Sequence, residues 1–584
     1  MFLPMTRDEM EALGWQQLDV ILVTGDAYID SPFIGVAVIG RILAQHGFRV
    51  GIIAQPELNT DADISRLGEP SLFWGITGGS IDSMVANYTA SGRRRKSDDY
   101  TPGGLNTRRP DRAVIAYANL IRRFHKQTAP LVLGGIEASL RRIAHYDYGD
   151  NAIRRSILFD AKADYLLYGM ADRSIVELAQ ALAANKPPTA LRGLCYVAQT
   201  PPEEAIILPT FQETAKDHQA FIAMFHSFYA NNDPVSARPL AQQQDSRFLI
   251  HNPPQPPLST SELDAVHALP FTRDCHPLHL QEGPVKALET IRFALATHRG
   301  CYGECNFCAI AVHQGRTIQS RSIDSLVREA ASFTADPAFK GIITDAGGPT
   351  ANMYGFDCAR KHVKGACQDK RCLYPRICPS LKPQHRAQLE LLRRLKAIPG
   401  IRKINVASGI RYDLILADKQ HGAEYLRTVI RHHTSGQMKV APEHSDAAVL
   451  EAMGKPGMES LLRFREQFNR MTAEEGLAQF LTYYMIAGHP ACTLESMEAL
   501  RRFCRRELKL LPRQVQLFTP SPSTWSTLMY HTGINPFTGS PCFCEKNPAA
   551  RERQKAVLTG TMAPKAPPPV QQPPKTNKPG RRKH

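Results

Sequence analysis

Hydrophobic residues in the first third of the chain occur in short continuous runs, and each run ends in a glycine-rich or polar turn. These segments cover residues 19–32, 35–56, 71–79, 129–139 and 163–170. The second of them begins with helical spacing, which Gly47 ends, and continues as a strand that Pro56 closes. Strands that are apolar throughout are typical of parallel sheets covered on both faces. The pattern predicts an α/β fold, with a doubly wound, Rossmann-like parallel sheet over residues 1–230.

The periodicity is lost in the next segment. Residues 231–284 are rich in Pro, Gln and Ser and show little alternation of polar and apolar positions. Such composition is typical of connecting chain. We therefore expect a linker over residues 231–284.

Regular spacing returns after residue 285. Six apolar strand candidates alternate with helical stripes, such as the one in which Ile323, Leu326, Val327 and Ala330 follow the i, i+3, i+4, i+7 pattern. Repeated strand–helix units favour a parallel (βα)6 partial TIM barrel, and we predict this core over residues 285–545. In such sheets the functional groups lie at the carboxyl ends of the strands.

Residues 546–584 form a basic, Pro-rich tail, for which we expect disorder. The formal net charge of the chain is +16, and from residue 549 onward there are nine basic residues and one acidic residue. A mildly basic body with a basic tail is compatible with RNA contact, although most such charge is solvated surface. A nucleic-acid-binding or tRNA-modifying protein with a structural metal is therefore the alternative class.

The bulk composition of the 584 residues is that of a globular protein, with 43% hydrophobic and 22% charged residues. No apolar run approaches the ~18 residues of a membrane span. The first residues include acidic ones where a signal peptide has basic and then apolar ones. We expect a cytoplasmic protein with no membrane partner.

Thirteen cysteines indicate metal or redox chemistry if the compartment is reducing, and ten of them lie between Cys301 and Cys542. Cys301, Cys305 and Cys308 have the spacing C-x3-C-x2-C and directly follow the first strand candidate of the core. Three thiolates can hold three irons of a [4Fe–4S] cubane and leave the fourth iron open. A zinc site completed by a distant ligand such as His313 is the alternative.

This cysteine motif, with Phe307 ahead of the last thiol and a six-unit parallel barrel around it, resembles that of the radical S-adenosylmethionine (SAM) superfamily. The resemblance implies that Cys301, Cys305 and Cys308 bind a [4Fe–4S] cluster whose open iron chelates SAM. It also implies that an electron from the cluster cleaves SAM to methionine and a 5′-deoxyadenosyl radical, which abstracts a substrate hydrogen.

The superfamily also has a glycine pair after the second strand, whose backbone meets the SAM amino group. Gly347 and Gly348 match it, and Pro349 replaces the usual acidic residue. After the third strand, Ser408 and Arg411 stand where contacts to the SAM carboxylate or ribose are expected. The resemblance thus implies cofactor contacts from these four residues and from Phe307, while it leaves catalytic residues toward the substrate unknown.

Taken whole, the chain resembles the YgiQ-type, UPF0313-like branch of the superfamily, on stretches such as GGIEASLRRIAHYDYGD (134–150), KVAPEHSDAAVLEAMGKPG (439–457) and YYMIAGHPACTLES (483–496). The N-terminal part resembles a cobalamin-binding-type domain. Such domains ligate cobalt through D-x-H-x-x-G, but the turn after Asp26 has no histidine two residues on. The resemblance implies an electron donor such as flavodoxin or ferredoxin and leaves the substrate unknown.

A second set of cysteines follows the second strand of the core, at Cys358, Cys367, Cys372 and Cys378. Lys and Arg residues between them would lower thiol pKa values and favour metal binding. The set predicts one of three states: an auxiliary Fe–S cluster, a zinc knot, or reduced cysteines without metal.

Overall fold

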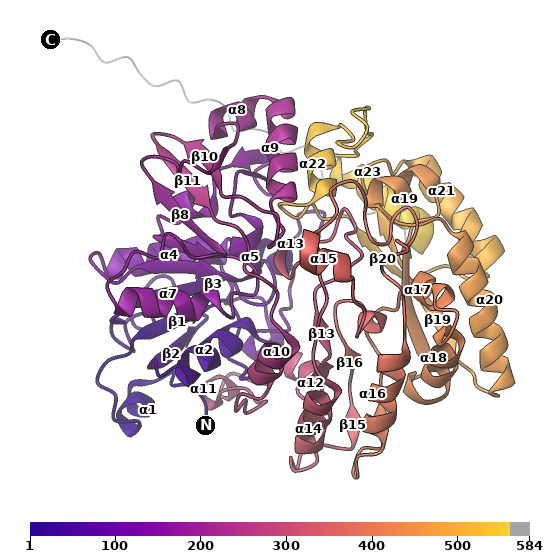
Figure 1. The fold of residues 1–584 in the computed structure, drawn as a ribbon, viewed down its shortest axis with the longest axis horizontal. Helices are drawn as coiled ribbons and strands as arrows, with labels where there is room; N and C mark the ends of the chain where they lie inside the picture. The colour runs from indigo at the N-terminus through magenta and orange to yellow at the C-terminus, as the bar shows by residue number, and fades with distance from the viewer. Residues whose placement is uncertain (561–584) are drawn as a thin grey trace.

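The computed structural model describes residues 1–560, and two halves lie side by side in it (Figure 1). The N-terminal half is built on one nine-stranded sheet of order β2-β1-β3-β4-β7-β8-β11-β10-β9. Its first five strands in that order are parallel, with bounds β2 Val50–Ala54, β1 Val20–Thr24, β3 Phe73–Thr77, β4 Leu131–Gly134 and β7 Tyr165–Leu167. The prediction of an α/β fold with a large parallel sheet is confirmed.

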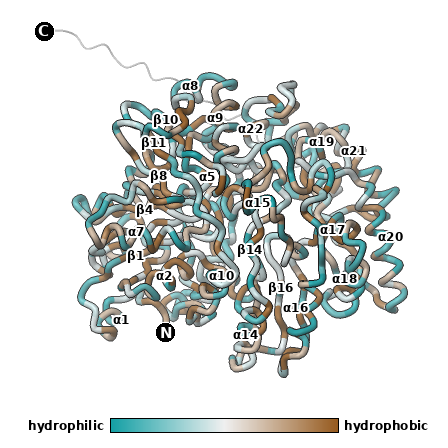
Figure 2. Tube along the Cα trace, in the orientation of Figure 1, coloured by the Kyte–Doolittle hydropathy of each residue, from teal (hydrophilic) through white to brown (hydrophobic). Residues whose placement is uncertain are grey.

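Helices cover both faces of this sheet. Every residue of β1 and β2 is buried, as the continuous apolar runs predicted. One face packs against α2 (Gly35–Gln45) and α7 (Ser174–Ala183), and the other against α4 (Ala113–Phe124) and α9 (His218–Ala230). Figure 2 shows apolar segments gathered along the strands and polar ones on outer helices such as α20. The remaining helices of this half are α1 Arg7–Ala12, α3 Ser83–Asn87, α5 Gly135–Leu140, α6 Ile157–Asp160 and α8 Phe211–Lys216.

The linker predicted over residues 231–284 is wrong in its middle part. Strands β10 (Leu240–Gln244) and β11 (Arg247–His251) form an antiparallel hairpin that pairs with β8 (Leu194–Ala198), and β9 (Ile206–Ile207) closes the edge. Gln242 and Gln244 are fully buried there, and their Oε1 atoms accept from the backbone N–H groups of Ala144 and Ser156. The hydrophobic pattern does not reveal this strand, because buried glutamines look like surface residues in the sequence. Their amides are hydrogen-bonded to partners that are distant in sequence. Two helices follow, α10 (Thr260–His267) and α11 (Pro277–Leu280).

The strands of the second half pair in parallel and in chain order. Strand β12 (Leu295–Ala296) pairs with β16 (Ala346–Gly347), and β15 (Ile342–Ile343) pairs with β17 (Lys403–Ile404). Strand β18 (Gln437–Glu443) pairs with β19 (Phe480–Ala487), which in turn pairs with β20 (Gln514–Leu517). A parallel bridge from Ile410 to Val440 links the last two groups. The first strand candidate of the core, residues 287–300, was predicted too long, because its first residues form the helix α12 (Ala287–Ile291).

Helices alternate with these strands, including the predicted stripe over residues 323–330, which lies within α14 (Ile323–Phe333). The others are α13 Ile310–His313, α15 Ala359–Lys364, α16 Arg386–Lys396, α17 Tyr412–Ala417, α18 Gly422–Thr428, α19 Ala447–Met453, α20 Glu459–Glu474, α21 Leu494–Phe503 and α22 Trp525–Thr532. Two short hairpin pairs, β13 (His298–Arg299) with β14 (Gln319–Ser320) and β5 (His145–Asp147) with β6 (Ala152–Arg154), complete the strands.

The disordered tail predicted over residues 546–584 is wrong at its start. Residues Pro548–Thr559 form α23, which contacts α21, β19 and β20. Arg551 and Leu558 of this helix are fully buried. The rest of that predicted tail, residues 561–584, lies outside the described part of the chain.

Helices α5 and α13 lie in contact and help to join the two halves (Figure 1). Since α5 follows β4 and α13 follows the three-cysteine loop, this contact brings the carboxyl edge of the N-terminal sheet to the cysteine loop. No helix in residues 1–560 is long and apolar enough to cross a membrane.

Candidate functional site

The three-cysteine loop lies between β13 and α13, and Gly303 is at its centre. The backbone N–H of Gly303 donates to Sγ of Cys301 at 3.3 Å. A Cβ atom at residue 303 would lie 3.2 Å from that sulfur and 3.7 Å from Sγ of Cys305. Two of the thiols therefore border the same space beside a residue without a side chain.

The segment that follows Gly347 and Gly348 reaches the first thiol. Oγ1 of Thr350 lies 3.5 Å from Sγ of Cys301, and Sδ of Met353 lies 3.9 Å from the same sulfur. The structure thus brings the predicted glycine pair and the predicted cysteine motif together at the carboxyl ends of neighbouring strands.

The thiols lie in a setting that disfavours free thiolates. Burial, together with the neighbouring thiols Cys305 and Cys301, raises the pKa of Cys308 to about 12. Burial also raises the pKa of Cys301, which the hydroxyl of Thr350 partly offsets. Thiols that raise each other's pKa repel as thiolates, and metal binding relieves this repulsion by taking up the negative charge.

The donor set fits a cluster rather than a single ion. Within residues 1–560, no three His, Cys, Asp or Glu side chains converge on a position for one metal ion. In a cubane each thiolate ligates its own iron, so the three sulfurs do not share one centre. Nδ1 of His313 is hydrogen-bonded to Oγ of Ser139 at 3.1 Å, which leaves Nε2 as the nitrogen for a metal, so the zinc alternative stays a prediction.

The glycine pair is required by close packing. A Cβ atom on Gly348 would lie 2.6 Å from Cε1 of His298, so only glycine fits over this imidazole. The backbone N–H of Thr297 donates to the carbonyl of Gly347 at 2.8 Å, which fixes this strand end against the first strand. Both glycines line a cavity between the halves of the chain.

Ser408 lies in the same wall of the cavity, but its hydroxyl is already used. It donates to the carboxylate of Asp345, which also accepts from the backbone N–H of Ala407 at 2.8 Å. Asp345 is a site residue that the sequence analysis missed. Its position two residues before the glycine pair, at the end of a predicted strand, could have indicated it.

Arg411 points its free nitrogen toward the cysteine loop. Its Nε donates to Oδ1 of Asp413 at 2.9 Å, and one terminal nitrogen pairs with the other carboxylate oxygen. The second terminal nitrogen lies 3.7 Å from where a Cβ atom would stand if residue 303 were not glycine. Burial opposes the charge, but the carboxylate of Asp413 outweighs it and holds the pKa of Arg411 above its usual range.

Glu443 is a second residue that the sequence analysis missed. It ends β18 with a φ of 70°, and its side chain is buried. Burial raises its pKa, and Nζ of Lys455 lies 3.7 Å away. A buried carboxyl on a left-handed non-glycine residue at a strand end is a frequent feature of functional sites.

Phe307 packs where the cores of the two halves meet. Its ring lies edge-on to His489 with the ring centroids 6.1 Å apart. The aromatic residue of the motif therefore anchors the loop through apolar contact.

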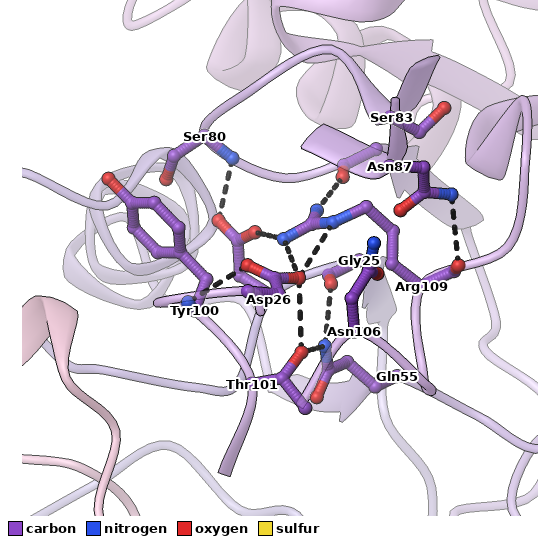
Figure 3. Close-up of polar contacts among 12 residues, drawn as sticks. Gly25, Asp26, Gln55, Ser80, Ser83, Asn87, Tyr100, Thr101, Asn106 and Arg109 are labelled. Carbon is purple, nitrogen blue, oxygen red and sulfur yellow. Dashed lines mark hydrogen bonds and ion pairs between the residues drawn. The ribbon is translucent and has the colours of Figure 1, made fainter. Parts of the chain in front are cut away.

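Asp26, where the sequence showed no cobalt-ligating histidine, belongs to a buried ionic network (Figure 3). Arg109 donates to Oδ1 of Asp26 at 2.7 Å, to Oδ2 of Asp98 at 3.0 Å and to the carbonyl of Gly78 at 2.6 Å. The other oxygen of Asp26 accepts from the backbone N–H of Ser80 at 2.6 Å. Asp26 therefore binds the chain itself at the carboxyl ends of β1 and β3.

The second set of cysteines does not assemble into one site. Cys358 and Cys372 are buried in a small apolar cluster, whereas Cys367 and Cys378 are partly exposed. None of the four belongs to a group of metal-ligating side chains in the described residues. The split between two buried and two partly exposed thiols favours reduced cysteines without metal, but each of the three states stays a prediction.

Comparison with known proteins defines the class. The family model described as Radical SAM N-terminal matches residues 2–294. A UPF0313 protein of Fusobacterium nucleatum is 51% identical over 96% of this chain and 98% of its own length, and one of Thermotoga maritima is 46% identical over 95% and 98%. The chain belongs to the radical SAM proteins and, within them, to the UPF0313 family. The prediction of a radical SAM enzyme is confirmed.

Among solved structures, the radical SAM methyltransferase TsrM from Kitasatospora setae, with tryptophan substrate and a SAM analogue bound, aligns at 16% identity. Its TM-score is 0.47, and the alignment covers 86% of this chain and 75% of that one. The cobalamin-dependent SAM radical enzyme OxsB, with aqua-cobalamin and SAM bound, aligns at 11% identity and a TM-score of 0.46 over 85% and 53%.

Proposed function

We propose that this chain is a radical SAM enzyme in which Cys301, Cys305 and Cys308 hold a [4Fe–4S] cluster. The observation that carries the proposal is the arrangement of the three-cysteine loop. Its thiols are partly buried around Gly303 at the end of the first core strand, beside the segment that follows Gly347 and Gly348. When bound, the cluster supplies the electron that cleaves SAM to methionine and a 5′-deoxyadenosyl radical.

The proposed architecture is a Rossmann-like N-terminal domain followed by a (βα)6 partial TIM barrel. Pairing of the core strands in parallel and in chain order supports the barrel. The hairpin β10–β11 joins the sheet, so the N-terminal domain extends beyond residue 230 to at least His251. The core ends with α23 rather than at residue 545.

The residues of this chain would bind and orient SAM rather than react with it. The free terminal nitrogen of Arg411 faces the cysteine loop and could bind a carboxylate there. Gly348 has no side chain, so a ligand can approach its backbone closely. The hydroxyl of Ser408 and the carboxylate of Asp345 provide oxygen atoms for hydrogen bonds to the ligand. Asp413 and Glu443 are buried, and the side chain of Arg411 is only 12% exposed, so the pair of Arg411 with Asp413 is largely shielded from water.

The donor that reduces the cluster is proposed to be a small electron carrier such as flavodoxin or ferredoxin. The substrate is unknown, and so is whether SAM is consumed or regenerated. Cobalamin is not part of the proposal, because Asp26 is engaged by Arg109 and offers no imidazole to cobalt.

The test is anaerobic reconstitution with iron and sulfide. We expect about four irons per chain, a reduced-cluster electron paramagnetic resonance (EPR) signal that changes when SAM is added, and 5′-deoxyadenosine after reduction with dithionite. Cys301→Ala should abolish all three. Cys504→Ala, which removes a buried thiol elsewhere in the core, should retain them. A colourless, zinc-loaded protein that forms no 5′-deoxyadenosine would refute the proposal.

A further inference from the structure

A cavity of about 470 Å³ lies between the two halves of the chain. One end is formed by the residues that follow the core strands, including Gly347, Gly348 and Ser408. The other end is formed by the carboxyl edge of the N-terminal sheet, where the chain leaves β1, β3, β4 and β7. We refer to the latter as the N-terminal end of the cavity. The volume is within the range of ~300–1,000 Å³ typical of small-molecule sites.

The N-terminal end contains one charged side chain, Asp26, which shares Arg109 with a second carboxylate, so the network keeps one net negative charge. Arg109 lies 2.7 Å from Asp26 and also pairs with Asp98, so two carboxylates share one guanidinium (Figure 3). All three side chains are almost fully buried. The network leaves no positive charge for a ligand at this end.

The rest of the lining supplies no free cation either. Among the described residues that line the cavity, Arg299 is the only arginine or lysine, and it pairs with Asp172 at 2.7 Å. Burial lowers the pKa of His298 and that of His313 to about 4, so both imidazoles are neutral at pH 7. A buried anion would therefore have no cationic partner here.

The walls at the N-terminal end are apolar. They come from both covering helices and from the strands between them: Ile34, Val38 and Ile39 beside or in α2, Ile175 in α7, Val132 in β4 and Leu167 in β7. These side chains can bury a ligand body by the hydrophobic effect, which contributes about 25 cal/mol per Å² of apolar area.

We propose that the N-terminal end of the cavity binds a predominantly apolar part of the substrate that bears no negative charge, and holds it next to the core strand ends. The inference rests on the proposed function only in identifying the ligand as the enzyme's substrate. The binding itself does not require the cluster. It excludes phosphate-bearing groups from this end. A nucleotide of an RNA chain could therefore not be buried there with its phosphates.

The test uses three naphthalene probes with the same body and different charge: 2-naphthylmethanol, 2-naphthoate and 2-naphthylmethylamine. Their affinities for the full-length, anaerobically reconstituted chain are measured by isothermal titration calorimetry. We expect the neutral alcohol and the amine each to bind at least about tenfold more tightly than 2-naphthoate, because the lining has carboxylates but no free cation and burying an unpaired anion is costly. Binding of 2-naphthoate within threefold of the alcohol, or no binding of the alcohol, would overturn the inference.

Two variants locate the binding. Ile39→Trp should fill the cavity from α2 and reduce the affinity for the alcohol at least about tenfold, and Ile175→Phe should do so from α7. Ile115→Trp is the matched control, since it also alters a partly buried isoleucine on a helix but packs on the opposite face of the sheet. Unchanged affinity in both cavity variants, with melting temperatures showing that they are folded, would refute the location. Loss of SAM cleavage without loss of probe binding would count only against the proposed function.

Discussion

Nζ of Lys361 lies 3.4 Å from Oε1 of Glu304, and this pair joins the segment of the second cysteine set to the loop of the first. Glu304 stands between Cys301 and Cys305 with a φ of 46°. Its carboxylate also has the guanidinium of Arg316 at 3.8 Å. The three-cysteine loop is thus fixed by a buried cluster of charged side chains.

Replacing Lys361 should therefore loosen the three-cysteine loop. Removing one partner of a buried ion pair costs about 3–5 kcal/mol, so Lys361→Met should lower the free energy of unfolding by about that amount. The reconstituted variant should also retain less iron per chain after dialysis. Arg393→Met, which breaks the exposed pair with Glu390, is the control and should change neither quantity. Wild-type stability and iron content in Lys361→Met would contradict this role.

The second cysteine set should not add metal. Because its thiols do not assemble, the double variant Cys367→Ser/Cys378→Ser should keep the iron content of the wild type, and both proteins should lack zinc. Elemental analysis of anaerobically prepared protein measures this directly. About eight irons per chain in the wild type, falling to about four in the double variant, would instead establish an auxiliary cluster.

Arg551 should contribute strongly to stability although it lies in the segment predicted as a tail. It is fully buried, donates to the hydroxyl of Tyr148 at 2.6 Å and also binds the carbonyl of Phe518. Arg551→Met leaves both oxygens without a buried donor, which should cost about 2–4 kcal/mol in urea unfolding. Arg553→Met, on the exposed side of the same helix, should have little effect. Equal effects of the two substitutions would show that α23 does not pack as described.

Stability should decrease as the pH falls below about 6.5. Burial lowers the pKa of His433 to about 4, whereas an unfolded histidine titrates near 6.5. Between these values the unfolded state binds more protons, so each such histidine removes up to about 1.4 kcal/mol per pH unit as the pH falls.

The histidine prediction is tested by urea unfolding at pH 7, 6, 5 and 4.5. His433→Gln should give a shallower loss of stability with falling pH than the wild type, and the exposed substitution His46→Gln should leave the slope unchanged. If the slope in His433→Gln equals that of the wild type, His433 does not titrate in this range.

The hydrophobic pattern predicted those parts of the fold in which each strand is apolar on both faces. This pattern identified the parallel strands β1, β2, β3, β4 and β7 and the helix α14, because the residues that they bury are mostly apolar. The strand with Gln242 and Gln244 and the helix with Arg551 were missed, since polar residues are buried there with partners far away in the sequence.

The candidate site shows the same division. Spacing alone identified Cys301, Cys305 and Cys308, because three thiols for one cluster must come from one short loop. It did not identify Asp345 or Glu443, whose roles depend on what lies opposite them.

The sequence by itself determined the class of chemistry, the parallel strand–helix organisation and the cysteine loop, all of which are local properties of spacing and polarity. Only the tertiary structure decided that Asp26 is bound by Arg109, that Ser408 donates to Asp345, and that an apolar cavity without a free cation opens between the halves. The physical reason is that charge compensation and cavity shape depend on distances between residues that the chain order separates by tens to hundreds of positions.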